Sequence, residues 1–85
     1  MLMNIDEKIA PSNLREAGKM LGADGEVTLD FSSVCRIDAA TLRELADLAR
    51  IADEKSVKVI VRGANVDVYK VLKLTKLTQR FSFAN

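Results

Sequence analysis

One stretch constrains this chain more than any other: Val27–Leu42, which reads VTLDFSSVCRIDAATL. An apolar run ends at Asp30, a short polar turn follows, and Asp38 stands where a helix N-cap would stand. The pattern predicts a strand that delivers its carboxyl end to an exposed helix N-terminus. In open α/β domains, such crevices are where ligands and partners are bound. The stretch lacks the nucleophile, base or metal ligand of an active site, so it favours a protein-interaction site.

Length, charge and cysteine content exclude several classes of protein. We expect the 85 residues to form a single domain, residues 1–85. A net charge of +1 and few aromatic residues argue against nucleic-acid binding. No apolar run approaches the ~20 residues of a membrane span, and the start of the chain does not read as a signal peptide. A single cysteine fits a reducing compartment, so the expected location is the cytoplasm.

The residue types that carry most catalysis are scarce in this chain. It has no histidine, which removes the commonest general base and metal ligand at neutral pH. It also has no Gly-rich phosphate loop and no CxxC motif. Cys35 is expected to be a small, partly buried loop residue without a redox role. We therefore expect no enzyme activity, no cofactor and no metal.

Apolar and polar segments alternate in a way that predicts the order strand, helix, strand, helix, strand, helix, strand. The expected strands are Met1–Ile5, Val27–Phe31, Val57–Arg62 and Phe81–Phe83. This alternation predicts a mostly parallel sheet with right-handed crossovers, in which the helices cover one face more completely than the other.

Capping residues place the three helices. Pro11-Ser12 is predicted to mark the start of the first helix, with Ser12 as its N-cap, and Gly22 is predicted to be its C-cap. Asp38 is expected to cap the second helix, and Asn65 the third, which runs to about Lys76. The single acidic residue in the first turn, Asp67, and Lys70, Lys73 and Lys76 toward the end of the third helix suit the helix dipole.

The second helix has a flank on which polar and aliphatic residues are mixed. One stripe is apolar and faces the core: Leu42, Leu45, Leu48, Ala49 and Ala52. The opposite stripe is charged: Arg43, Asp47, Arg50 and Glu54. Between these stripes lie Thr41, Glu44, Leu48 and Ile51. An aliphatic side chain on a solvated flank beside a helix N-terminus suggests a partner surface. The alternative is a lone surface isoleucine without a role.

At this point the residues resemble a known family. DFSSVCRIDAATL is similar to the signature of the STAS domain, found in anti-sigma-factor antagonists and sulfate transporters. The usual form is a strand ending Asp-Leu-Ser, a short turn, and Ile-Asp-Ser-Ser-Gly-Leu opening a helix. Asp30-Phe31-Ser32, Ile37-Asp38 and Leu42 match this form. Val71–Leu77, VLKLTKL, resembles the closing helix of the family, so the resemblance covers about Leu14 to Phe83.

The resemblance implies a small single-domain α/β fold with a mostly parallel four-stranded sheet and about three helices, in the order β-α-β-α-β-α-β. The usual fold begins with a further strand before the one expected at Met1–Ile5, and that strand is expected to be missing. The open sheet edge that results would permit weak homodimerisation. Lys76 stands where the family commonly has glycine near the end of the third helix.

The departures from the signature bear on regulation. In phosphoregulated antagonists the partner kinase phosphorylates the second serine after the aspartate, and this position is Ala40. The first serine corresponds to Ala39, and the glycine to Thr41. A phosphate brings about −1.5 to −2 charges and can disrupt an interface, but Ala40 has no hydroxyl to accept it. Thr41 is the alternative phosphorylation site, against its reading as a helix residue whose methyl packs beside Leu45.

The resemblance implies a regulatory binding module that docks onto an anti-sigma factor or serine kinase. The expected partner surface comprises Asp30, Ser32, Ser33, Asp38, Ala39, Ala40, Thr41, Glu44, Leu48 and Ile51. A second hypothesis is the cytoplasmic STAS subunit of a phospholipid-transport ABC system, whose partner is the ATPase; its third helix resembles Val68–Leu74, VYKVLKL. A third hypothesis is nucleotide binding at the same helix N-terminus, with Arg36 as the available cation.

Overall fold

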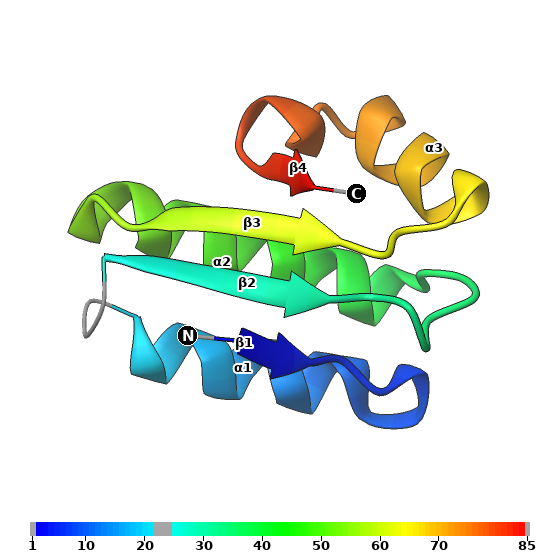
Figure 1. Ribbon diagram of the computed structural model, residues 1–85, viewed down its shortest axis with the longest axis horizontal. Coiled ribbons are helices and arrows are strands. Elements are labelled where there is room, and N and C mark those ends of the chain that lie inside the picture. Colours follow the sequence, from blue (N-terminus) through cyan, green and yellow to red (C-terminus); the bar gives the residue numbers. More distant parts are fainter. Residues whose placement is uncertain (1, 22–24, 85) are drawn as a thin grey trace.

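The strands form one parallel sheet whose order follows the chain, β1-β2-β3-β4 (Figure 1). The protein is described by a computed structural model that covers residues 2–21 and 25–84. Its strands are β1 (Leu2–Asn4), β2 (Glu26–Asp30), β3 (Lys58–Arg62) and β4 (Ser82–Ala84). Its helices are α1 (Ala10–Met20), α2 (Ala39–Lys55) and α3 (Val66–Leu74), with short 3-10 helices at Glu7–Ile9 and Leu77–Gln79. The predicted alternation and parallel sheet are confirmed.

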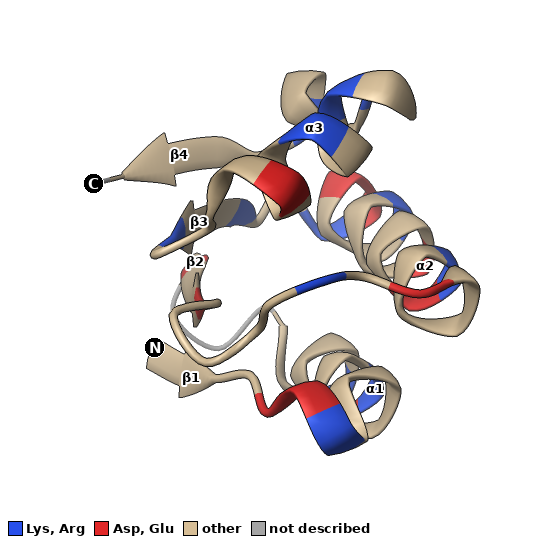
Figure 2. Cartoon of the chain, turned by 90° about the vertical axis from the view of Figure 1, so that its right-hand side faces the viewer, with Lys and Arg blue, Asp and Glu red and all other residues tan. Residues whose placement is uncertain are grey.

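The helices lie on one side of the sheet. Crossovers between parallel strands are right-handed in nearly all proteins, so a sheet that grows in one direction places every crossover helix on the same face. Figure 2 shows α1, α2 and α3 on the same side of the strands. Within residues 2–21 and 25–84 no helix covers the other face, which goes further than the predicted unequal covering.

Alternation along the two central strands decides which side chains fill the core. Val27 and Leu29 in β2, with Val59 and Val61 in β3, are buried toward the helices. The intervening residues point to the opposite face, which is more accessible. The strands begin or end within one residue of the predicted bounds, and Phe31 is a fully buried residue just after β2.

The start of α1 differs from the prediction. Ser12 is not its N-cap, because a 3-10 helix at Glu7–Ile9 runs directly into α1. Asp6 caps this turn, its carboxylate accepting a hydrogen bond from the Lys8 amide at 3.0 Å. Pro11 lies in the first turn of α1, where a missing N–H costs no helical hydrogen bond. The predicted C-cap, Gly22, lies outside the described residues.

The mixed flank of α2 packs against α1. Gly18 of α1 lies so close to α2 that a Cβ placed on it would be 3.5 Å from Cδ1 of Ile51. Ile51 is packed against the core, and Leu48 is only 1% exposed. The prediction of a solvated flank with an exposed aliphatic is therefore wrong. An aliphatic residue was needed there because the absence of a side chain on Gly18 lets the two helices approach closely.

The end of α3 is set by a left-handed residue. The helix ends at Leu74, two residues before the predicted end, and Lys76 has a φ of 65°. That backbone conformation favours glycine, because a side chain there is crowded by the following carbonyl. Lys76 therefore occupies a turn that suits glycine without having the conformational freedom of glycine.

Candidate protein-interaction site

The candidate site is the loop from residue 32 to residue 38, together with the first turn of α2, at the carboxyl end of β2. Asp38 caps α2 as predicted: its Oδ1 accepts a hydrogen bond from the Thr41 amide at 2.8 Å. This bond stabilises the charged carboxylate and lowers the pKa of Asp38. Ala39 and Ala40 follow, and both are exposed. The helix therefore begins with a capped turn whose outer surface consists of small side chains.

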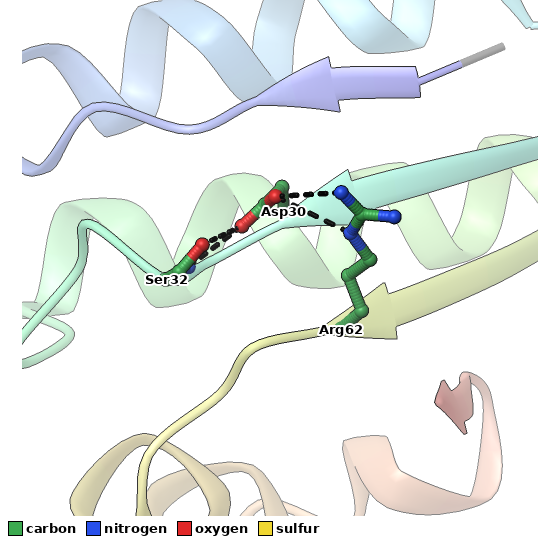
Figure 3. Close-up of polar contacts among 3 residues, drawn as sticks. All are labelled: Asp30, Ser32 and Arg62. Atoms are coloured by element: carbon green, nitrogen blue, oxygen red, sulfur yellow. Dashed lines mark hydrogen bonds and ion pairs between the residues drawn. The ribbon is translucent and has the colours of Figure 1, made fainter. Parts of the chain in front are cut away.

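Asp30 organises the beginning of the loop (Figure 3). Its carboxylate accepts hydrogen bonds from the hydroxyl and the amide of Ser32, and from Nε and Nη2 of Arg62, each of these two at 3.2 Å. The bond from the Ser32 hydroxyl is the largest of the effects that lower the pKa of Asp30. Asp30 is half-buried, so it shapes the site while Ser32 and Ser33 present the exposed surface.

Glu7 holds the middle of the loop, although nothing in the sequence pattern singled it out. Its Oε1 accepts hydrogen bonds from the amides of Cys35 at 2.7 Å and Arg36 at 2.9 Å. These two bonds, with that from Arg36 the larger effect, lower the pKa of Glu7. Cys35 is exposed, not partly buried as predicted, because its backbone rather than its side chain faces this carboxylate.

Asn65 joins the loop to α3. Its Oδ1 accepts from the Val68 amide at 2.8 Å and so caps α3 as predicted. Its Nδ2 donates to the carbonyls of Val34 at 3.4 Å and Cys35 at 3.1 Å. Side chains at Asp30, Glu7 and Asn65 therefore fix the loop from three different elements of the chain.

Four of the predicted surface residues are buried or packed against neighbouring elements. Thr41 is a buried polar residue that is only 3% exposed, so its hydroxyl is not presented to solvent. Leu48 and Ile51 are packed as described above. Glu44 is partly buried and forms an ion pair with Arg15 of α1 at 3.3 Å. The predicted surface is thus confined to the loop and the first residues of α2.

A shallow apolar groove adjoins this surface on the other side of α2. It has a volume of about 350 Å³ and is lined by Ala39, Leu42, Arg43, Ala46, Thr75 and Leu77. Because Ala39 belongs both to the groove and to the first turn of α2, the two features form one continuous surface. Nothing in the sequence indicated the groove, because its two walls come from segments at least 29 residues apart.

Comparison with known proteins identifies the family. The sequence profile of the family described as "Mlab, STAS domain" matches residues 7–82, which is most of the chain. The chain belongs to the STAS domain family. Both segments that resemble the STAS signature, Asp30–Ser32 and Ile37–Leu42, lie within the matched residues. No curated protein matches the sequence.

Solved structures show the same fold. A crystal structure of a proposed anti-sigma factor antagonist from Thermotoga maritima aligns with a TM-score of 0.77 and 17% sequence identity, covering 96% of this chain and 72% of that one. An NMR structure of the same protein aligns with a TM-score of 0.80 and 17% identity, covering 99% of this chain and 72% of that one. Within the described residues of the STAS domain, no helix is long and apolar enough to cross a membrane.

Proposed function

We propose that this STAS domain is a non-catalytic, cytoplasmic adaptor that binds a partner protein through the N-terminus of α2. The binding surface consists of Ser32, Ser33, Asp38, Ala39 and Ala40, together with the groove beside them. The observation that carries the proposal is the exposure of two alanines directly after a capped helix start. Small side chains there allow the backbone of a partner to approach closely. The hydrogen bonds from Asp30, Glu7 and Asn65 already hold the loop in place, so binding costs less conformational entropy.

The adaptor works without a phosphorylation switch at the usual position. Ala40 replaces the serine that phosphoregulated members modify, and it has no hydroxyl. The alternative acceptor, Thr41, is buried. Binding is therefore constitutive, and it is controlled by the amounts of the two proteins rather than by a kinase acting on α2.

The partner we propose first is an anti-sigma factor of the serine-kinase class. The resemblance of the signature to anti-sigma-factor antagonists supports this choice, and the likeness to the Thermotoga maritima structures supports the fold on which it depends. The alternative partner is the ATPase subunit of a phospholipid-transport ABC system. It is favoured by the similarity of Val68–Leu74 to the third helix of the STAS subunits of such systems.

Affinity capture with the tagged full chain, followed by mass spectrometry, separates the two partners. Recovery of an anti-sigma factor supports the first, and recovery of a transporter ATPase supports the second. The surface is tested with Ala40→Glu, which places a charge on it while an acidic residue in the first turn remains compatible with the helix dipole. We expect partner binding to weaken at least about tenfold, the effect of roughly 1.4 kcal/mol.

Ser12→Glu is the matched control, because it places the same charge at an exposed position in the first turn of a different helix, α1. Both variants should retain the thermal unfolding midpoint of the wild type. If Ala40→Glu bound the captured partner as tightly as the wild type and the control, the α2 N-terminus would not be the docking surface.

A further inference from the structure

The net charge of the chain is unevenly distributed, because acidic residues are scarce in its last part. Residues 63–85 hold four of the thirteen Lys and Arg residues but only one of the twelve Asp and Glu residues, a net charge of +3. The rest of the chain then carries −2, although the whole has only +1. Three of these four cations, Lys70, Lys73 and Lys76, lie on α3 or just after it, and all three are exposed. The segment around α3 therefore has an excess of positive over negative charge, and Figure 2 shows its basic residues in blue.

The same face of α3 carries the most exposed large apolar side chains of the described residues. Leu74 is 84% exposed and Val66 is 68% exposed. Both lie on one line of the helix with Lys70 between them, at spacings of four residues. Lys70, Lys73 and Lys76 surround Leu74 in a single surface depression. Isolated surface leucines are common. Here the leucine is surrounded by lysines, and it lies on a helix whose opposite side is buried. The exposed side of α3 therefore combines apolar and basic residues, as the membrane-facing sides of interfacial helices do.

The kind of cation on this face indicates what it binds. The ion pairs within residues 2–21 and 25–84 use Arg15, Arg50, Arg62 and Arg80. None of the three lysines around Leu74 takes part in them. Arginine suits a fixed carboxylate because its planar guanidinium forms paired hydrogen bonds, whereas lysine is a flexible, strongly hydrated point charge. A cluster of lysines therefore matches a diffuse negative surface better than it matches individual acidic side chains.

We propose that the outer face of α3 binds the surface of an anionic lipid bilayer. The lysine ammonium groups would lie among the headgroups, with their alkyl chains along the apolar boundary. Leu74 and Val66 would enter the shallow interfacial region, which requires no preformed pocket. The surface is distinct from the α2 N-terminus, and the inference does not depend on the proposed function.

Vesicle co-sedimentation with the full chain tests the inference. The probes are vesicles of phosphatidylcholine alone and vesicles that also contain 30% phosphatidylglycerol. At this composition roughly one lipid in three is charged, so that the cluster of lysines can contact several negative charges. We expect binding only to the anionic vesicles, and a decline with salt as screening grows. Replacing Lys70, Lys73 and Lys76 with Gln should weaken binding by roughly fivefold per residue, about 100-fold in all. Leu74→Ser should weaken it by about tenfold.

Matched controls separate this face from general charge and apolarity. Lys8, Lys19 and Lys58 are exposed lysines on other elements, and their triple replacement with Gln removes the same charge. Ile9→Ser removes an aliphatic side chain that is 51% exposed on another surface. These controls should bind as the wild type does. Equal weakening by the two triple variants, or no binding to anionic vesicles, would overturn the inference. The inference would also be overturned if Leu74→Ser still bound the vesicles and the lysines were found to capture an acidic protein.

Discussion

The side chain of Asn65 makes a quantitative prediction, because it performs two tasks that different substitutions can separate. In Asn65→Ala the Oδ1 cap of α3 is lost, which costs about 1 kcal/mol. The two Nδ2 bonds to the Val34 and Cys35 carbonyls are also lost, at about 0.5 kcal/mol each near the lower end of the usual range, because Cys35 is exposed and water can replace the donor. The free energy of unfolding should therefore fall by about 2 kcal/mol.

Asn65→Ser separates the two tasks, since serine caps a helix as well as asparagine but cannot reach the loop carbonyls as a donor. We expect this variant to lose only about 1 kcal/mol. For a domain of this size, the unfolding midpoint should fall by roughly 10 °C in the alanine variant and roughly 5 °C in the serine variant. Urea unfolding followed by circular dichroism gives both free energies.

Hydrogen exchange supplies the test that bears on the loop itself. The amides of Cys35 and Arg36 are bonded to Glu7, and they should exchange faster in both Asn65 variants if the side chain of Asn65 holds the loop. Two results would refute the reasoning. One is equal destabilisation of the serine and alanine variants, and the other is unchanged exchange at these amides in Asn65→Ser.

Three further predictions follow from backbone geometry and from the lowered pKa values. Lys76→Gly should raise the free energy of unfolding by about 0.5 kcal/mol in urea titrations, because relief of the left-handed conformation exceeds the added freedom of the unfolded chain; a decrease would contradict this. Gly63→Ala should lower it by about 2 kcal/mol, since Gly63 has a φ of 73° and an added Cβ would lie 3.0 Å from the Ser32 amide nitrogen; an unchanged urea midpoint would show that the turn adapts. Stability should also fall with pH. The three carboxylates of the site have a lower pKa in the folded state, so their contribution is complete above the ordinary values of 4.5 for Glu and 3.8 for Asp and is lost as the pH falls through the folded values. Unfolding midpoints measured from pH 6 to pH 2.5 should show this loss, and Glu7→Gln should reduce its steepness; an unaltered slope would remove Glu7 from the explanation.

The sequence predicted those parts of the molecule that depend on near neighbours. Asp38 and Asn65 cap their helices by accepting hydrogen bonds from amides three residues away. Both residues lie in short polar segments before a helix, where capping is the main role for such a side chain. The order of strands and helices follows from the same local patterns. The family resemblance was carried by two such segments, and it was confirmed by the match of the family profile.

The features that sequence reasoning missed depend on contacts between distant segments. Ile51 was assigned to the surface because nothing in α2 reveals that Gly18, 33 residues earlier, leaves room for it. Glu7 bonds amides 28 and 29 residues away, and a glutamate before a helix gives no sign of such a partner. Ser12 was assigned as the cap of α1 because Pro11 is typical of a first helical turn, yet the preceding 3-10 helix moved the start of the helical segment to Glu7.

The sequential order of the strands has a consequence for how this fold assembles and comes apart. No strand has to slip between two that are already paired, so the sheet can be extended one crossover at a time, and each step closes only a short length of chain. The ladder between β2 and β3 has five paired residues, whereas those at β1 and β4 have three each. The outer strands are therefore the first to fray, while the central pair persists until the whole domain unfolds.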